Sequence, residues 1–425
     1  MKPDRTRQPA LVIPDRVGMP GATVHTLANG MELYAVQSTA QHLLRVSFVF
    51  RAGSACQSHP FVASATANLL GEGTARYTAA GIADRLDFYG SYYDVSLDRD
   101  YAVVTVCSLS KFLPQTLEVL GQMLLHPTFP EAELRTYADK RKQQLAVERG
   151  KVSFRARELF AASLFGPEHP YGVSYDAARY DELTPELLRD FYARHYTAAN
   201  GFVVASGRIT PAALKAIGAL AAGLPAGSAV PVPVFPAVAQ VPEAFAAQPG
   251  AVQSAIRIGR RLFTRDHPDF IPMQVLVTVL GGYFGSRLVA NLREERGYTY
   301  GVFAALVNLD REGYMAIATE VTADATDDAV AQVFAEMERL RTEPVGDEEL
   351  EAVRNIMTGE VMRLVDGPFG VADVTIENIQ SGSGPDYVDR FVAAVRGVTP
   401  AQLPELARRW FDPAAFTTVV VGPGK

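Results

Sequence analysis

The chain contains the same sequence pattern twice, and this internal repeat restricts its fold more than any other feature. Residues 184–207 begin with Thr-Pro, continue as an amphipathic helix and end in an apolar strand closed by a glycine. Residues 399–422 repeat this order without gaps. Thr184 and Thr399 are suitable N-caps, because each precedes a proline at the first helical position. Such a repeat indicates a duplicated domain.

A second, shorter repeat has nearly the same spacing in the sequence. Residues 98–101 and 310–314 both end in tyrosine, and both precede an apolar strand. Between the two halves lie residues 221–250, which contain six prolines and many alanines. This segment is too rich in proline for a helix or a central strand, so we expect a linker there. The two domains are therefore expected at residues 1–220 and 251–425.

Each half reads as one or more strands, a helix, a pair of strands, further helices and a final strand. The opening strands are expected at residues 32–37, 43–52 and 251–260. Strands and helices alternate irregularly, and hairpin signals are mixed in. This pattern favours an α+β fold of two homologous domains over a doubly wound parallel sheet.

Composition excludes several classes of protein. The chain has 425 residues, 48% of them hydrophobic, a net charge of −7 and no basic run, so nucleic acid is not an expected partner. Cys56 and Cys107 lie too far apart for a disulfide framework or a cysteine-rich zinc site. Residues 1–20 lack a signal-like apolar segment, and no stretch approaches the length of a membrane span. We expect a cytoplasmic protein, although a chain trimmed of a signal peptide would read the same.

The segment at residues 281–302 is the most informative for function. It reads as a glycine-rich turn, an amphipathic helix ending in charged residues, a glycine and an aromatic strand, and it places Arg293 seven positions before Tyr300. Arginine keeps its charge and donates through a fixed fork, while tyrosine donates an O–H at neutral pH. Together they could hold a peptide backbone and stabilise an oxyanion. The spacing alone also fits a helix end with a solvated charged face.

Other sites are not supported by this segment. Its glycines lack the Gly-Lys-Ser/Thr ending of a phosphate-binding loop and also the dinucleotide-binding fingerprint. The chain has no Gly-x-Ser-x-Gly sequence to hold a catalytic serine. Nucleotide binding and serine hydrolase chemistry are therefore not expected.

A helix expected at residues 61–70, followed by Gly-Thr at 73–74, resembles the pitrilysin/insulinase family. That family carries the zinc motif His-x-x-Glu-His on this helix. The resemblance extends over most of the chain, through Pro-Thr-Phe at 127–129, His-Pro-Tyr-Gly at 169–172, Tyr196, Asn200, Gly-Ser-Arg-Leu at 285–288, Arg293 and Tyr300. It implies two α/β-roll domains of the short bacterial type.

The same resemblance places Ser64, Ala67 and Asn68 at the zinc-motif positions. None of these side chains ligates zinc well, and Ala67 cannot accept a proton. The seven histidines are never closer than 17 residues, so no helical turn presents two of them. We therefore expect a degenerate zinc motif and no metal in this chain.

The remaining candidate ligands do not change this expectation. In the family a third ligand, a glutamate, lies on a downstream helix. The comparable helix here, expected at residues 131–148, has Gln143 and Gln144 near that place, and Glu148 would stand alone. His59 precedes a proline in a loop, where a histidine is expected to be solvated.

In the family, one homologous unit holds zinc and another reaches across a chamber with an arginine and a tyrosine. Some bacterial members divide these duties between two polypeptides, and mitochondrial processing peptidase does so in a related manner. The resemblance therefore implies that Arg293 and Tyr300 are catalytic residues in an otherwise inactive subunit. Zinc is expected in a paralogous partner, in a heterodimer that cleaves peptides. Gly285 and Ser286 are expected to shape the helix start and to contact substrate through their N–H groups.

Two alternative functions remain open at this stage. The chain could be a scaffold homologue without a peptidase role, like the core subunits that the family lends to respiratory complexes. It could also be an independent peptidase with an unrecognised metal site. Packing of homologous units would permit a homodimer of the isolated chain.

Arg287 and Arg296 are expected to form structural ion pairs.

Overall fold

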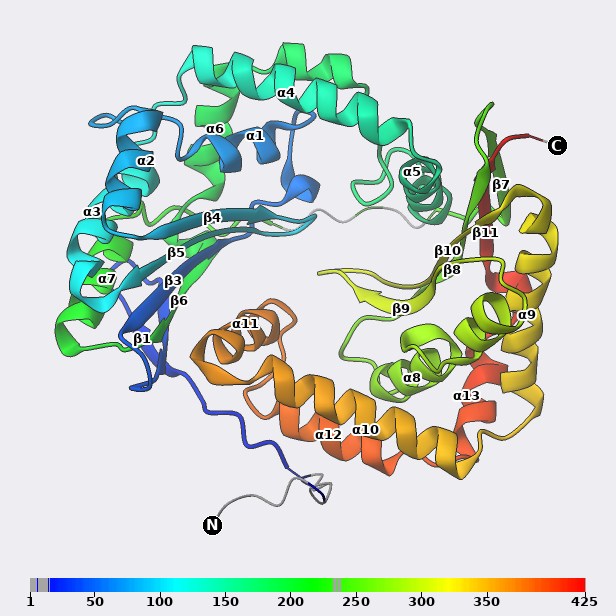
Figure 1. Ribbon diagram of the computed structural model, residues 1–425. Coiled ribbons are helices and arrows are strands. Elements are labelled where there is room, and N and C mark those ends of the chain that lie inside the picture. The colour runs from blue at the N-terminus through cyan, green and yellow to red at the C-terminus, as the bar shows by residue number, and fades with distance from the viewer. Residues whose placement is uncertain (1–5, 7–13, 15, 232–234, 236–237, 425) are drawn as a thin grey trace.

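The computed structural model describes residues 6, 14, 16–231, 235 and 238–424, and these form two mixed β-sheets covered by helices (Figure 1). The first sheet has strand order β1-β2-β6-β3-β5-β4 and the second has order β7-β11-β8-β10-β9. The strands of the first sheet are β1 (Thr23–Thr26), β2 (Glu32–Gln37), β3 (Leu43–Phe50), β4 (Tyr92–Leu97), β5 (Ala102–Leu109) and β6 (Gly201–Gly207). Those of the second are β7 (Glu243–Ala247), β8 (Gln253–Leu262), β9 (Val302–Asn308), β10 (Gly313–Thr322) and β11 (Thr417–Gly422).

The two sheets are built alike, which confirms the predicted α+β fold of two homologous domains. In each sheet the final strand inserts beside an opening strand in parallel, β6 beside β2 and β11 beside β7. The other neighbours of β6 and β11, which are β3 and β8, run antiparallel to them. Only β1, at the edge of the first sheet, has no counterpart in the second.

Helices occur in both halves. In the first half they are α1 (Val62–Leu69), α2 (Ala79–Phe88), α3 (Leu113–Leu125), α4 (Glu131–Arg149), α5 (Val152–Phe165), α6 (Pro185–His195) and α7 (Pro211–Ala222). In the second half they are α8 (Phe270–Val277), α9 (Thr326–Thr342), α10 (Asp347–Leu364), α11 (Gly367–Gln380), α12 (Tyr387–Gly397) and α13 (Gln402–Trp410). No helix among the described residues is both long and apolar enough to cross a membrane.

The two repeated helix starts differ in their capping. The Thr184 side chain accepts a hydrogen bond from the N–H of Leu187 and caps α6, as predicted. The helix after Thr399 begins only at Gln402, so the prediction of Thr399 as its N-cap is wrong. The Gln402 side chain instead accepts a hydrogen bond from the N–H of Thr399, at 2.9 Å, and this contact closes the turn before α13.

The linker is shorter than the predicted residues 221–250, because β7 lies inside that segment. Strand β7 is a short edge strand that contains no proline itself and lies between Pro242 and Pro249. The Pro242 carbonyl, just before β7, accepts a hydrogen bond from the N–H of Thr418. Residues 232–234 and 236–237 of the expected linker lie outside the described residues.

One helix from each half crosses to the sheet of the other half. Helix α5 packs on β8 and β11, and its counterpart α11 packs on β2 and β6. Phe160 and Leu164 of α5 lie in one apolar cluster with Val419, while Val371 of α11 lies in another with Val204. Residue 220 therefore lies between the two sheets, but residue 251 lies after β7 of the second sheet, and neither boundary separates the two packing units.

Candidate functional site

The segment of Arg293 and Tyr300 is a helix end followed by a tight chain reversal. Arg293 lies in a π-helical segment, Val289–Glu295, and Gly297 takes a left-handed conformation with φ of 66°. The N–H of Tyr298 donates to the Leu292 carbonyl at 2.9 Å, and this bond closes the C-terminus of the π-helical segment around Gly297. This glycine therefore returns the chain past the helix end that carries Arg293.

Tyr300 lies in the loop after this reversal and not in a strand, because β9 begins only at Val302. The loop is anchored on both sides of it. The Thr319 hydroxyl lies 3.0 Å from both the Thr299 hydroxyl and the Gly301 carbonyl, and the Tyr298 hydroxyl donates to Asp328 at 2.8 Å. The Tyr300 side chain itself is 94% exposed. An anchored loop thus presents an exposed phenol.

Arg293 is exposed as well. Its guanidinium carbon lies 4.7 Å from the centre of the Phe284 ring, a cation–π distance. Within the described part of the chain, no hydrogen bond joins Arg293 to Tyr300 and no carboxylate forms an ion pair with Arg293. The structure therefore leaves both side chains without a polar partner of their own.

The neighbouring arginines are structural, as predicted. Arg287 forms a two-pronged ion pair with Glu349, with both N–O distances 2.9 Å. Arg296 donates to the Asn291 side chain at 2.9 Å. These pairs hold the helix against its surroundings, and among the described residues Arg293 is the arginine of the segment that has no ion pair.

The expected contact of Ser286 with substrate needs correction. Ser286 is 0% exposed, and its N–H donates to the Tyr283 carbonyl at 3.1 Å, so neither its side chain nor its N–H is accessible. Gly285 is exposed, but an added Cβ would lie 2.8 Å from the Tyr283 ring. The two residues shape the helix start, and only Gly285 could still meet a peptide.

Helix α1 carries the three residues expected at the zinc-motif positions. The Ser64 hydroxyl donates to the Phe61 carbonyl at 3.0 Å, and the Asn68 side-chain NH₂ donates to the Ser64 carbonyl at 2.8 Å. Ala67 is 0% exposed and belongs to the main apolar core of the first half. This face of α1 thus satisfies its own polar groups and offers no imidazole or carboxylate.

Aromatic side chains gather beside this part of α1. Phe61, at the start of the helix, stacks on Tyr180 with ring centres 3.8 Å apart. Tyr137 of α4 lies at the same cluster, and burial raises the pKa of its hydroxyl to about 12. His59 pairs with Glu182 at 3.0 Å, so the prediction of a simply solvated histidine is wrong.

Among the described residues, no group of three histidine, cysteine, aspartate or glutamate side chains is placed to hold a metal ion. Gln143 and Gln144 of α4 are exposed, and Glu148 is partly buried. The side chains at α1 and α4 therefore do not fit a zinc site.

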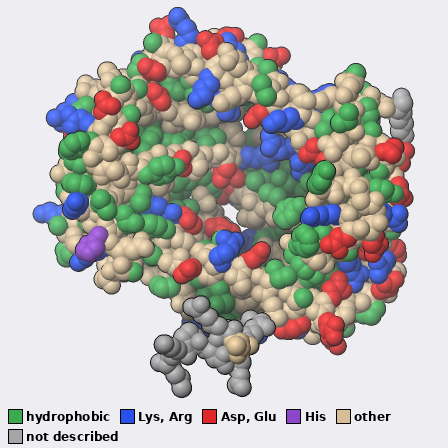
Figure 2. All heavy atoms as spheres, viewed as in Figure 1, with side chains coloured by type: hydrophobic (Ala, Val, Ile, Leu, Met, Phe, Trp, Pro, Cys, Tyr) green, Lys and Arg blue, Asp and Glu red, His purple; other side chains and the backbone are tan. Residues whose placement is uncertain are grey.

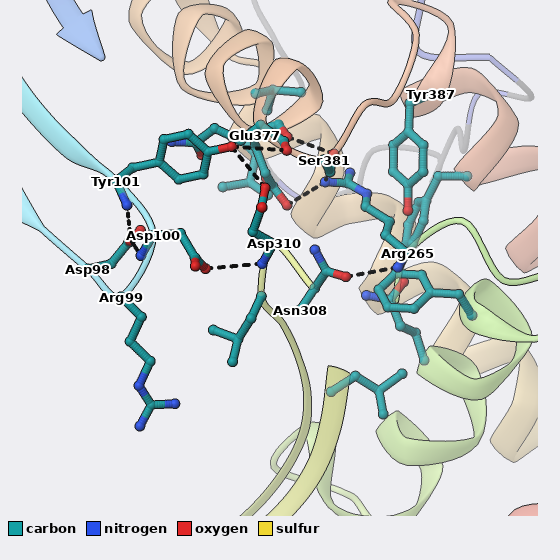
Figure 3. A pocket seen from close by; sticks show the side chains of 18 of the residues that line it. Asp98, Arg99, Asp100, Tyr101, Arg265, Asn308, Asp310, Glu377, Ser381 and Tyr387 are labelled. Carbon is teal, nitrogen blue, oxygen red and sulfur yellow. Dashed lines mark hydrogen bonds and ion pairs between the residues drawn. The ribbon is translucent and has the colours of Figure 1, made fainter. Parts of the chain in front are cut away.

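A cavity of about 730 Å³ lies between the two halves, and sequence reasoning did not assign it (Figure 3). The two echoed segments meet there. The N–H of Asp310 donates to Asp100 at 3.0 Å, and the Tyr101 hydroxyl donates to Asp310 at 3.1 Å. Arg51 pairs with Asp310 at 2.6 Å. Burial raises the pKa of Asp100 above its ordinary value. The similarity between residues 98–101 and 310–314 was the sequence signal for this contact between the two halves.

The far wall of the same cavity belongs to the second half. Arg265 pairs with Glu377 of α11 at 2.8 Å, and its guanidinium carbon lies 3.7 Å from the centre of the Tyr387 ring (Figure 3). Every charged group named here therefore has a partner, and this cavity reads as part of the contact between halves.

Tyr300 borders a different cavity, of about 320 Å³, together with Arg257, Thr299 and Glu320. Sequence reasoning did not single out Arg257 or Glu320. For Glu320 the available signal was that it is the single charged residue of β10, whereas Arg257 is one of three arginines in β8 and is not distinguished by the sequence.

Two family models match the chain. Residues 35–163 match the model described as insulinase (peptidase family M16), and residues 182–357 match the model described as peptidase M16 inactive domain. Together the two matches span most of the chain.

Curated relatives give the same result. An uncharacterized zinc protease of Mycobacterium tuberculosis is 26% identical over 56% of this chain and 56% of that protein. An uncharacterized zinc protease of Streptomyces coelicolor is 23% identical over 80% of this chain and 76% of that protein. Mitochondrial-processing peptidase subunit alpha of Solanum tuberosum is 25% identical over 52% of this chain and 45% of that protein. The match to the first of these relatives thus spans just over half of its length.

Solved structures share the fold. A Pseudomonas fluorescens structure described as peptidase M16 inactive domain aligns with a TM-score of 0.88 at 22% identity, covering 95% of this chain and 98% of that one. A chain of respiratory complex III from Candida albicans aligns with a TM-score of 0.76 at 14% identity, covering 95% and 96%. At these identities the likeness concerns the fold.

Proposed function

Because the chain belongs to the insulinase (peptidase M16) family, we propose that it is the substrate-binding, transition-state-stabilising subunit of a heterodimeric zinc metallopeptidase. In this proposal the chain is inactive alone, a zinc-bearing paralogue supplies the metal, and this chain supplies Arg293 and Tyr300. The observation that carries the proposal is Tyr300, which an anchored loop holds out with its hydroxyl unused by any described neighbour.

The chemistry of α1 supports a partner for the metal. The side chains of Ser64 and Asn68 donate hydrogen bonds to backbone carbonyls at the helix, and the Ala67 side chain has no atom that could bind a metal or accept a proton. We read these positions as a degenerate zinc motif and derive no step of the reaction there. In the partner, zinc would activate water and polarise the scissile carbonyl.

Tyr300 suits the role of an oxyanion donor. Peptide hydrolysis at a metal forms negative charge on the former carbonyl oxygen, and one donor aimed at this oxygen contributes about 3–4 kcal/mol. An anchored loop limits the motion of Tyr300, so little ordering is needed at the moment of reaction. Its present exposure matches a donor whose acceptor arrives only with substrate and partner.

Arg293 suits the role of a backbone clamp. A guanidinium can donate two parallel hydrogen bonds and so fix the register of an extended peptide. The Phe284 ring beneath it restricts where the guanidinium can lie without consuming its N–H groups. Arg293 and Tyr300, at the two ends of one chain reversal, would contact neighbouring parts of the same peptide.

The test begins with the partner. Co-purification from the native source should yield a protein of similar size that carries the inverted zinc motif, and the reconstituted pair should cleave an unfolded peptide. Tyr300→Phe should leave assembly intact and lower kcat about 100- to 1000-fold, the value expected for one lost oxyanion donor.

Tyr298→Phe is the matched control, because it removes a hydroxyl from the same loop that is bonded to Asp328. It should alter stability slightly and turnover little. Unchanged turnover in Tyr300→Phe would refute the proposed role. Cleavage by the paralogue that is equal with and without this chain would instead identify a scaffold.

A further inference from the structure

The cavity beside Tyr300 lies next to the start of the crossing helix α5, at the edge of the area of the second sheet that α5 covers. Helix α5 packs on β8 and β11, and the cavity opens beyond it towards β10 and the Tyr300 loop. Its polar side chains come from Ser153 of α5, Gln253 and Arg257 of β8, Thr299 and Tyr300 of the loop, and Thr319 and Glu320 of β10. A volume of about 320 Å³ is at the lower end of the range for ligand pockets and holds an amino-acid side chain.

Arg257 is the feature of this cavity that lacks a structural explanation. Its side chain is partly buried, and among the residues that the structure describes it has no hydrogen bond and no ion pair. Glu320 lies on the neighbouring strand but opposite Ala255, and Arg257 lies opposite Ala318. The two charges are therefore diagonal neighbours and attract each other without a direct bond.

A second cation faces Arg257 from α5. Burial, and next the positive charge of Arg157, lower the pKa of the Arg257 guanidinium, which nevertheless stays protonated at neutral pH. Figure 2 shows Lys and Arg side chains gathered near α5 at the rim of the central hollow. Arg157 and Arg257 near the single carboxylate of Glu320 leave an excess of positive charge, which favours the binding of an anion.

The first half shows what a structural arginine looks like in this setting. Arg45 of β3, the counterpart of β8, lies beneath the crossing helix α11. It donates to both carboxylate oxygens of Asp373 on α11, at 2.5 and 3.3 Å, and to the Phe369 carbonyl at 2.7 Å. The same architecture thus supplies a carboxylate to Arg45 and none to Arg257.

We propose that Arg257 binds a carboxylate of the peptide substrate beside Tyr300. The carboxylate belongs either to an acidic side chain or to the peptide C-terminus. A guanidinium fork matches both groups, and the neighbouring Tyr300 places the site next to the proposed reaction centre. The inference rests on the proposed function, because it takes Tyr300 to lie beside bound peptide, and it adds a preference for acidic substrate.

The test measures binding to the isolated chain, so that it does not depend on a partner or on cleavage. Fluorescence anisotropy would compare labelled Ala-rich peptides that differ only in one central Glu or Gln, each with an amidated C-terminus. A third peptide would carry Gln and a free C-terminal carboxylate. Wild type should bind at least one carboxylate peptide about tenfold more tightly than the neutral one, as for a charge-assisted hydrogen-bonded pair.

Arg257→Gln should abolish this difference while leaving the affinity for the neutral peptide unchanged, which also reports that the variant is folded. Arg257→Lys should retain part of the preference, because it keeps the charge but loses the fork. Arg261→Gln is the matched control on the same strand, since Arg261 donates to the Val238 carbonyl and does not line the cavity. It should keep the full preference.

Preference for the Glu peptide identifies the side-chain carboxylate as the source, and preference for the free C-terminus identifies the terminal one. Equal affinity for all three peptides, or no measurable binding of any, would overturn the proposal. So would a preference that survives in Arg257→Gln. Each of these results leaves the kinetic test of Tyr300→Phe untouched, so the two proposals can fail separately.

Discussion

The two halves share one strand order and one exchanged helix, yet they differ in what they leave open. In the first half, the α1 face is closed by aromatic rings and its own backbone bonds, and Arg45 is satisfied by Asp373. In the second half, Tyr300 stands in solvent and Arg257 faces a cavity without a hydrogen-bonded carboxylate. Duplication thus supplies two similar scaffolds, and within the described residues the second half is the one in which we propose a binding surface.

The largest expected effect concerns the closed face of α1. Ala67→Glu places a carboxylate at the position predicted for the base of the zinc motif, and this side chain would enter the apolar core. An unpaired buried carboxylate should lower the free energy of unfolding by about 3–5 kcal/mol. Urea denaturation measures this loss.

Asn68→Glu is the matched control one position further along α1, where the side chain is exposed. It should change the free energy of unfolding by about 0.5 kcal/mol or less. If the two variants were equally stable, this face of α1 would be open to water, and the contrast between the halves would be lost.

Much of this contrast was within reach of the sequence, because it depends on local patterns. Residues 32–37 form β2 as predicted, and the Thr-Pro repeat located the paired final strands β6 and β11. The residues at 64, 67 and 68 could be read directly for their lack of metal-binding groups. The packing of α5 and α11 on the sheet of the opposite half could not be predicted from the sequence. An amphipathic pattern shows that one face of a helix is buried, but it does not show which sheet covers that face.

The same reasoning explains the sites that sequence analysis missed. Arg45 is the single charged residue of its strand and Arg257 is one of three arginines in its strand, and neither sequence pattern tells whether the side chain is paired. Only the crossing helices decide that one has a carboxylate and the other has none. The N–H group of Ser286 was predicted to contact substrate, but Ser286 is buried by tertiary packing, which the sequence of the segment does not show.

An intermediate effect is expected from removing these two arginines. Arg45→Met breaks charge-assisted hydrogen bonds to Asp373 and Phe369 and should lower the free energy of unfolding by about 1–3 kcal/mol. Arg257→Met removes a partly desolvated cation that repels Arg157, so stability should stay the same or rise. Equal losses in urea denaturation would mean that Arg257 has a structural partner after all.

The smallest expected effect is a pH dependence that arises in the first half. His195 is 1% exposed and stacks on Phe191, and burial lowers the pKa of its imidazole below the ordinary 6.5. Below pH 6.5 the imidazole is therefore protonated in the unfolded chain while it is still neutral in the folded chain. The free energy of unfolding should fall as the pH falls. Above pH 6.5 both states are neutral, and this contribution should be constant.

His195→Gln should flatten this part of the pH profile, because the variant has no imidazole to titrate. Leu188→Ala, a buried change on the same helix, is the control. It should lower stability by a similar amount at every pH and leave the slope below pH 6.5 unchanged, since it alters packing and not proton uptake. A slope that persists in His195→Gln would assign the acid sensitivity to another buried group, of which His169, also with a lowered pKa, is the next to test.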